Sequence, residues 1–85
     1  MDRLVVNIQP FLKNQTVQYY KDNILDSEHL TDIRAIPDII KSYCKTDDIK
    51  QIDFFGSRIF ALRFKTDILK FTEFEKLNDV NITIH

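Results

Sequence analysis

Apolar residues occupy every second position near both ends of the chain. From residue 3 to residue 9 each even-numbered position is leucine, valine or isoleucine, which predicts a β-strand at Arg3–Gln9. Pro10 has no N–H group to donate, so we expect this strand to end there. Val80, Ile82 and Ile84 repeat the alternation and predict a closing strand.

The segment after Pro10 is compatible with two structures. Val17 and Tyr19 would share one face of a second strand, entered through a turn at residues 13–15. The spacing of Val17, Tyr20 and Ile24 would instead suit a short helix. We favour the strand, because adjacent aromatic residues fit a pleated surface.

A helical pattern occupies the next third of the chain. Asp26 or Ser27 can cap its start, and its apolar positions follow at steps of three, three, four, three and one residues: Leu30, Ile33, Ile36, Ile40, Tyr43 and Cys44. Pro37 lies within the pattern, removes one backbone hydrogen bond and disfavours helical geometry at the preceding residue. We therefore expect one or two turns, a bend, and a firmer helix from Pro37 to about Lys45.

Gly56, the only glycine, separates two apolar runs at residues 49–55 and 59–64, and this arrangement predicts a hairpin. A two-residue turn would mix charged and apolar side chains on both faces, so we expect a three-residue loop, Gly56-Ser57-Arg58. In that register the core face carries Ile52, Phe54, Phe60, Leu62 and Phe64, and the other face carries Gln51, Asp53, Phe55, Ile59, Ala61 and Arg63.

Apolar residues at three-residue steps predict a short helix at residues 67–77, although a capping-box pattern would also allow a helix starting at Thr72. Together these elements predict one α+β domain spanning residues 1–85. We expect a small two-layer sandwich, with a four- or five-stranded, mainly antiparallel sheet, one main helix and one short helix. The element order suits either a ferredoxin-like βαββαβ fold or a ubiquitin-like β-grasp.

Composition excludes several classes of protein. Twelve basic and thirteen acidic side chains give a formal charge of −1, so no overall field draws the chain to nucleic acid or to an anionic membrane. Neither a signal peptide nor an apolar run near the roughly 20 residues of a membrane span is visible, and we expect a cytoplasmic protein. With Cys44 as the only cysteine and two histidines far apart, we expect no disulfide, no metal and no cofactor.

Two short segments resemble known motifs. Phe55-Gly56-Ser57-Arg58 resembles the strand-end glycine-serine of minimal nucleotidyltransferases, a family that binds its metal with two acids one residue apart. Here Asp67 is followed by Leu69 at the second position, so we expect no enzymatic activity and interpret the tetrapeptide as a hairpin turn. Residues 58–64 resemble an RNA-recognition strand, but in the predicted register Phe60 and Phe64 pack in the core.

Charge and apolar residues together indicate a binding surface. Residues 22–53 carry a net charge of −4 and residues 58–70 a net charge of +3. Phe55 and Ile59 are large apolar residues on the predicted outer sheet face, where a solvated face would carry polar ones. We therefore expect a protein-interaction module whose contact residues are Phe55, Arg58, Ile59 and Arg63, with another protein or a second copy as partner.

The commonest residue types are those that AT-rich codons encode, and this favours an origin in an AT-rich genome. Short chains without cofactors are common in phages and mobile elements, so we expect an accessory or inhibitory protein of one of these. The alternative function is weak binding of single-stranded nucleic acid by the basic strand and the aromatic sheet face. Salt dependence would discriminate between the two, since only nucleic-acid binding weakens steeply with ionic strength.

Overall fold

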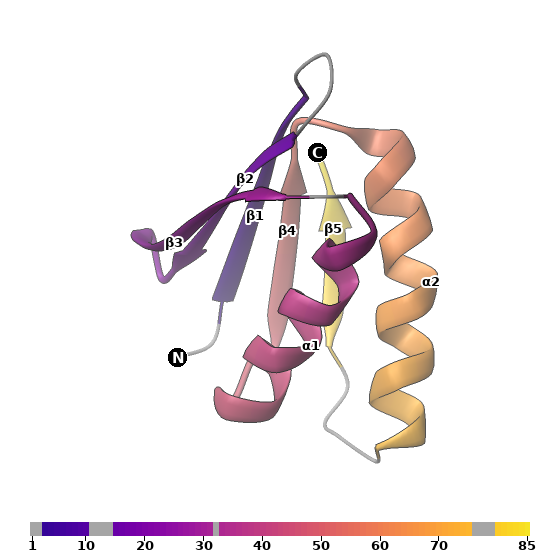
Figure 1. Cartoon of the computed structure of the whole chain (residues 1–85). Helices are drawn as coiled ribbons and strands as arrows, with labels where there is room; N and C mark the ends of the chain where they lie inside the picture. The colour runs from indigo at the N-terminus through magenta and orange to yellow at the C-terminus, as the bar shows by residue number, and fades with distance from the viewer. Residues whose placement is uncertain (1–2, 11–14, 32, 76–79) are drawn as a thin grey trace.

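The computed structural model describes residues 3–10, 15–31, 33–75 and 80–85. These residues form five strands, two α-helices and one short 3-10 turn. Their order is β1 (Arg3–Pro10), β2 (Gln15–Lys21), β3 (Ile24–Thr31), the 3-10 turn (Ile33–Ala35), α1 (Ile36–Thr46), β4 (Gln51–Phe55), α2 (Arg58–Phe74) and β5 (Asn81–Ile84). Figure 1 shows the five strands as one twisted sheet with both helices on the same side.

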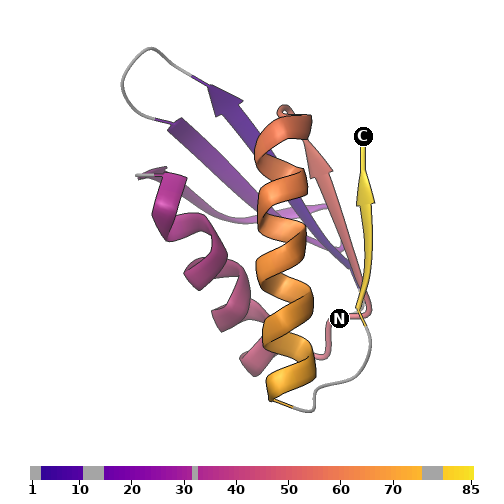
Figure 2. The same cartoon turned by 90° about the vertical axis from the view of Figure 1, so that its right-hand side faces the viewer.

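The central strand of the sheet is β1, and the strand order is β3-β2-β1-β4-β5. The strands β1, β2 and β3 form an antiparallel meander, while β4 pairs in parallel with β1 and β5 in parallel with β4. Parallel neighbours need a crossover connection, and α1 and α2 supply the two crossovers. The helices therefore lie side by side over one face of the sheet, as Figure 2 shows.

Alternation along the strands places the core between the sheet and the two helices. Apolar side chains of β1, β2 and β4 point to the helices and are almost completely buried: Leu4, Val6, Ile8, Val17, Tyr19, Ile52 and Phe54. The helices contribute Ile36 and Ile40 from α1, and Ala61, Phe64 and Ile68 from α2. The other face of the sheet has no layer over it among the described residues.

The two-layer α+β architecture is confirmed, and so are the strands predicted near residues 3–9, 16–22 and 80–84. Pro37 lies in the first turn of α1, as expected, after the short 3-10 turn. The turn predicted at residues 13–15 falls largely outside the described residues. The sheet is mixed rather than mainly antiparallel, with two antiparallel and two parallel pairs of strands. The ferredoxin-like and β-grasp topologies are both wrong, because three strands precede α1.

Residues 24–31 form a strand where the sequence pattern predicted the start of a helix. Asp22 and Asn23 both have positive φ angles, 47° and 71°, and make the two-residue turn that returns the chain along β2. Asp and Asn tolerate this backbone region better than other non-glycine residues, so the local sequence supports the hairpin. The firmer helix predicted from Pro37 to about Lys45 is confirmed as Ile36–Thr46, but the helical turns expected before it, capped at Asp26 or Ser27, are wrong.

Residues 58–74 form one helix where the pattern predicted a strand followed by a short helix. Ser57 begins it as N-cap, since its hydroxyl oxygen accepts a hydrogen bond from the Phe60 N–H at 3.4 Å. The buried positions are three or four residues apart: Ala61, Phe64, Ile68 and Thr72. The predicted hairpin, its three-residue loop and its register are therefore wrong, and Leu62, placed in the core by that register, is 57% exposed.

The corner between β4 and α2 depends on Gly56. Its φ angle is +97°, and a Cβ atom added there would lie 1.9 Å from the carbonyl oxygen of Ile8 on β1. The chain can therefore pass this close to β1 only without a side chain. The corner fixes where α2 begins and which of its sides faces the sheet.

Candidate partner-binding surfaces

The four predicted contact residues do not share one face. Phe55 ends β4 and points to the side of the sheet that the helices leave open. Arg58, Ile59 and Arg63 instead lie on α2, in the other layer of the molecule. Ala61, predicted beside them, is buried under α2. The single outer sheet face expected for these residues is thus replaced by two separate surfaces.

We define the open sheet face by the side chains of β1, β2, β4 and β5 that alternate with the core residues, together with His85 directly after β5: Arg3, Val5, Asn7, Gln18, Tyr20, Gln51, Asp53, Phe55, Thr83 and His85. Most of these residues are polar, and they bond to one another. Gln18 accepts hydrogen bonds from Asn7 Nδ2 at 3.2 Å and from the Tyr20 hydroxyl at 3.1 Å. Its own amide donates to Glu28 on β3 at 2.7 Å.

Asp53 is the central charge of the open sheet face. Its side chain is 6% exposed and pairs with Arg3 Nε from β1. It also accepts a hydrogen bond from Gln51 Nε2 at 3.1 Å, and its Oδ1 lies 3.2 Å from His85 Nε2. Burial alone would raise the pKa of Asp53, but the hydrogen bonds from His85, Arg3 and Gln51 outweigh it and hold the pKa below its ordinary value. These contacts join three strands and occupy the carboxylate.

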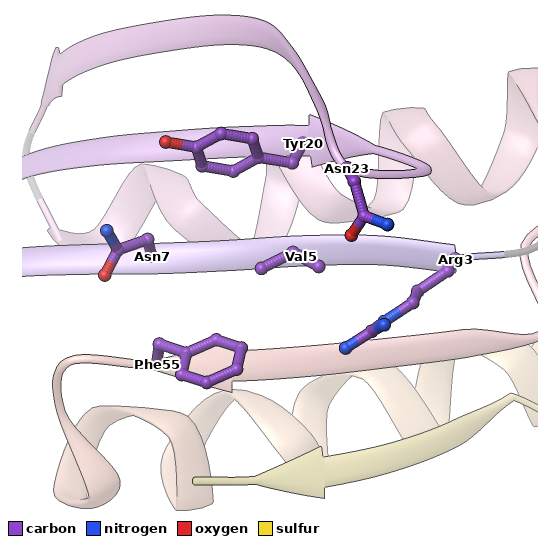
Figure 3. A pocket seen from close by; sticks show the side chains of 6 residues that line it. All are labelled: Arg3, Val5, Asn7, Tyr20, Asn23 and Phe55. Atoms are coloured by element: carbon purple, nitrogen blue, oxygen red, sulfur yellow. The ribbon is translucent and has the colours of Figure 1, made fainter.

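A shallow hollow of about 440 Å³ lies on the open sheet face over Val5 (Figure 3). Tyr20 from β2 and Phe55 from β4 border it on either side of β1, and Arg3, Asn7 and Asn23 complete its rim. The Phe55 ring stacks on His85, with 4.3 Å between ring centroids and 1° between planes. The hollow can accept a small apolar group, but the side chains of Arg3, Asn7 and Tyr20 around it already hydrogen-bond within the sheet.

The outward side of α2 carries the second surface. We define the outer stripe as Ile59, Leu62, Thr66 and Leu69, which lie on the solvent side of the helix and follow one another at steps of three, four and three residues. Ile59 is 79% exposed, Leu62 57% and Leu69 43%. Core packing explains none of these three side chains. The helix thus carries apolar side chains on its core side and also on its solvent side.

Four basic residues border the outer stripe, and we call them the basic flanks. Arg58 and Lys65 lie along one side and Arg63 and Lys70 along the other. None of the four forms a salt bridge with any residue that the structure describes.

The charge order along α2 opposes its dipole. The first turn contains Arg58 and no acid, and the last turn contains no base. Helices are stabilised by acids at the first turn and by bases at the last, so this order does not serve the stability of α2.

The residues considered for catalysis lie apart in the fold, with Cys44 on α1 and Gly56 and Ser57 at the corner between β4 and α2. No group of three or more His, Cys, Asp or Glu side chains that could hold a metal ion occurs among the described residues. Gly56 and Ser57 connect a strand to a helix, so their interpretation as a hairpin turn is wrong, and Asp67 lies on α2 without a second acid at Leu69. Burial raises the pKa of the half-buried Cys44 thiol to about 11.

Sequence reasoning missed Leu62 and Leu69 as surface residues and Tyr20 as a member of the open sheet face, whereas it placed Asp53 and Phe55 on the outer face of β4, where they lie. The spacing of the outer stripe was visible in the sequence, but the interleaved buried positions concealed it. Among the described residues, no helix combines the length and the apolar character needed to cross a membrane. Comparison of the chain with models of protein families, with curated proteins and with solved structures finds no match.

Proposed function

We propose that this chain is a non-enzymatic module that binds another protein through the outer stripe of α2. The observation that carries the proposal is the exposure of Ile59, Leu62 and Leu69 in one line on a helix whose opposite side already supplies the core. Isolated apolar residues on a surface need no explanation, but a line of them on a regular element is typical of an interface.

The outer stripe can supply useful binding free energy. Full burial of a leucine or isoleucine side chain is worth roughly 1.5–3 kcal/mol, so burying the exposed parts of these three contributes about 3–5 kcal/mol before ordering costs. Arg58 and Arg63 at the edge of the stripe add planar hydrogen-bond donors, which favour specificity and rate of encounter. Three of the four contact residues predicted from the sequence, Arg58, Ile59 and Arg63, thus belong to this surface.

The open sheet face supports partner binding less well. Its side chains already hydrogen-bond to one another, so a partner would have to compete with bonds such as that from Asn7 to Gln18. Phe55, the fourth predicted contact residue, is half-buried and stacked on His85.

Single-stranded nucleic acid, the alternative function, gains little from this geometry. A binder of this kind combines a basic groove with aromatic rings on the same surface. Here the basic flanks lie on α2, while Tyr20 and Phe55 lie on the open sheet face, in the other layer of the molecule. A strand of nucleic acid lying along α2 would contact the basic flanks and the exposed ring of Phe74, but neither of the two rings of the open sheet face.

The proposal extends to setting and role. We place the protein in the cytoplasm and assign it an accessory or inhibitory role in a phage or mobile element, because the chain has one cysteine and residue types with AT-rich codons. We assign it no catalytic reaction and no cofactor.

A photo-cross-linking residue in place of Leu62, in the full chain expressed in its native host, tests the proposal. We expect a specific protein adduct, identified by mass spectrometry, and no such adduct from the same residue in place of Ile24, an exposed apolar position at the start of β3. Purified partner should then lose affinity for Ile59→Gln/Leu69→Gln and keep it for the matched control Ile24→Thr/Leu25→Thr. Unchanged affinity for the α2 variant would refute this location of the interface.

A further inference from the structure

The spacing of the outer stripe matches one particular kind of partner, if α2 binds a protein as proposed. Steps of three, four and three residues from Ile59 to Leu69 are those of the a and d positions in a heptad repeat. In this frame Ile59 and Thr66 are a positions, and Leu62 and Leu69 are d positions. A seam of this spacing receives the side chains of a second helix lying nearly along α2.

Charge then defines the partner more closely. In the same frame the basic flanks are the positions that face a partner helix across the seam: Arg58 and Lys65 at g, Arg63 and Lys70 at e. All four are positive, and none has an acidic partner among the described residues. Charges at e and g select the partner by attraction and reject others by repulsion.

A second copy of this chain is a poor occupant of the seam. If two α2 helices paired in antiparallel fashion, Lys65 would face Lys65 of the other copy, and Arg63 would face its Lys70. If they paired in parallel, Arg58 would face Arg63, and Lys65 would face Lys70. Both arrangements bring like charges together along the whole contact.

We propose that the outer stripe binds an amphipathic helix whose apolar seam is bordered by Glu or Asp residues. Leu62 and Leu69 pack into the seam of that helix, and its carboxylates pair with the basic flanks. The helix α2 spans 17 residues, about 25 Å, which is long enough for two heptads of contact. An anionic membrane would also attract the basic flanks, but the outer stripe holds only three large apolar residues, interrupted by Thr66.

Two three-heptad peptides that differ only in charge test the inference. Both carry leucine at a and d; one has Glu at every e and g position and the other has Lys. Binding of each to the full chain is measured by fluorescence anisotropy at physiological ionic strength. We expect the Glu peptide to bind at least tenfold more tightly, which corresponds to about 1.4 kcal/mol.

Charge reversal supplies the matched variants. Arg63→Glu/Lys70→Glu should shift the preference towards the Lys peptide, whereas Lys50→Glu, exposed in the segment before β4, should leave it unchanged. Circular dichroism checks that each variant is folded. If the double variant does not fold, Lys70→Gln, which removes a single charge, should still lower the affinity for the Glu peptide. Ile59→Gln/Leu69→Gln should abolish binding of both peptides.

Several results would overturn the inference. Equal affinity for the two peptides, or binding of neither, would show that the flanks do not select an acidic helix, while the cross-link at Leu62 would still report whether α2 binds a protein at all. Binding to vesicles of phosphatidylserine and phosphatidylcholine that is lost in Ile59→Gln/Leu69→Gln would assign the outer stripe to a membrane. A dimer in sedimentation equilibrium that the same substitutions dissociate would assign it to a second copy.

Discussion

Replacing Gly56 with alanine should destabilise the fold by about 3 kcal/mol or more. The added Cβ would lie 1.9 Å from the carbonyl oxygen of Ile8, against about 3.4 Å for ordinary contact, so the corner would have to move away from β1 by about 1.5 Å. An L-residue at φ +97° costs about 1–2 kcal/mol by itself. Displacing the neighbouring end of β4 from β1, where Asn7 pairs with Phe55, weakens further hydrogen bonds worth about 1 kcal/mol each.

Urea denaturation followed by circular dichroism measures the change, and thermal melting should show a fall in Tm of about 12 °C or more, at 4–8 °C per kcal/mol for a domain of this size. D-Alanine at the same position is the sharpest control, because its backbone prefers positive φ and its Cβ points to the opposite side. Cys44 permits chemical ligation of the synthetic chain at the Tyr43–Cys44 bond. Stability within 1 kcal/mol of wild type for the L-alanine variant would refute the close approach of the corner to β1.

Leu62→Ala should change the free energy of unfolding by less than about 1 kcal/mol, because the side chain is mostly exposed. Ile68→Ala, on the same helix but fully buried, should cost about 2–5 kcal/mol; urea denaturation measures both variants. The pKa of Asp53 is lower in the folded chain than in the unfolded one. The stability that the ionised carboxylate gives the fold is therefore fully present above the unfolded pKa and is lost as pH falls through the folded pKa. The free energy of unfolding, measured by urea denaturation at a series of pH values, should accordingly fall more steeply below about pH 4 for wild type than for Asp53→Asn. Since burial raises the pKa of Cys44 to about 11, iodoacetamide at pH 8 should alkylate the native thiol at least about tenfold more slowly than the urea-unfolded one; equal rates would contradict that burial.

The sequence predicted best the strands that have one buried and one open face. In β1 the residues Leu4, Val6 and Ile8 point to the core and their neighbours point to the open sheet face, so burial and alternation coincide. The first turn of α1 was equally clear, because Pro37 fits only a few positions in a helix.

Two elements were mispredicted for different reasons. The strand β3 lies at a sheet edge and is largely exposed, so it lacks a buried apolar alternation, and the signal that could have found it is the Asp22-Asn23 turn. The helix α2 has apolar residues on its core side and on its outer stripe. Between residues 59 and 64 the two sets interleave into an apparent alternation of Phe60, Leu62 and Phe64, which imitates a strand.

The candidate site was predicted only in part, because residues 58–64 were interpreted as a strand and not as a helix. Arg58, Ile59 and Arg63 were singled out because large apolar and basic residues seemed to share a solvated face, and they do lie near one another on the surface. The face was assigned to the wrong element, so Phe55 was included and Leu62 and Leu69 were left out. Only the helical angle of 100° per residue brings Leu62 and Leu69 into line with Ile59.

The position of β1 at the centre of the sheet has a consequence for the order of events during synthesis. Its antiparallel edge is paired as soon as β2 follows, but its parallel edge must wait for β4, whose pairing partners are 48 residues further along the chain, as in Arg3 with Gln51. A ribosome adding roughly 5–20 residues per second takes several seconds to make that stretch. During that interval the meander of β1, β2 and β3 presents an unpaired strand edge beside an uncovered apolar face, which is the state most prone to pairing with another chain. Growth of α1 before β4 shortens this exposure, because Ile36 and Ile40 can cover that apolar face first.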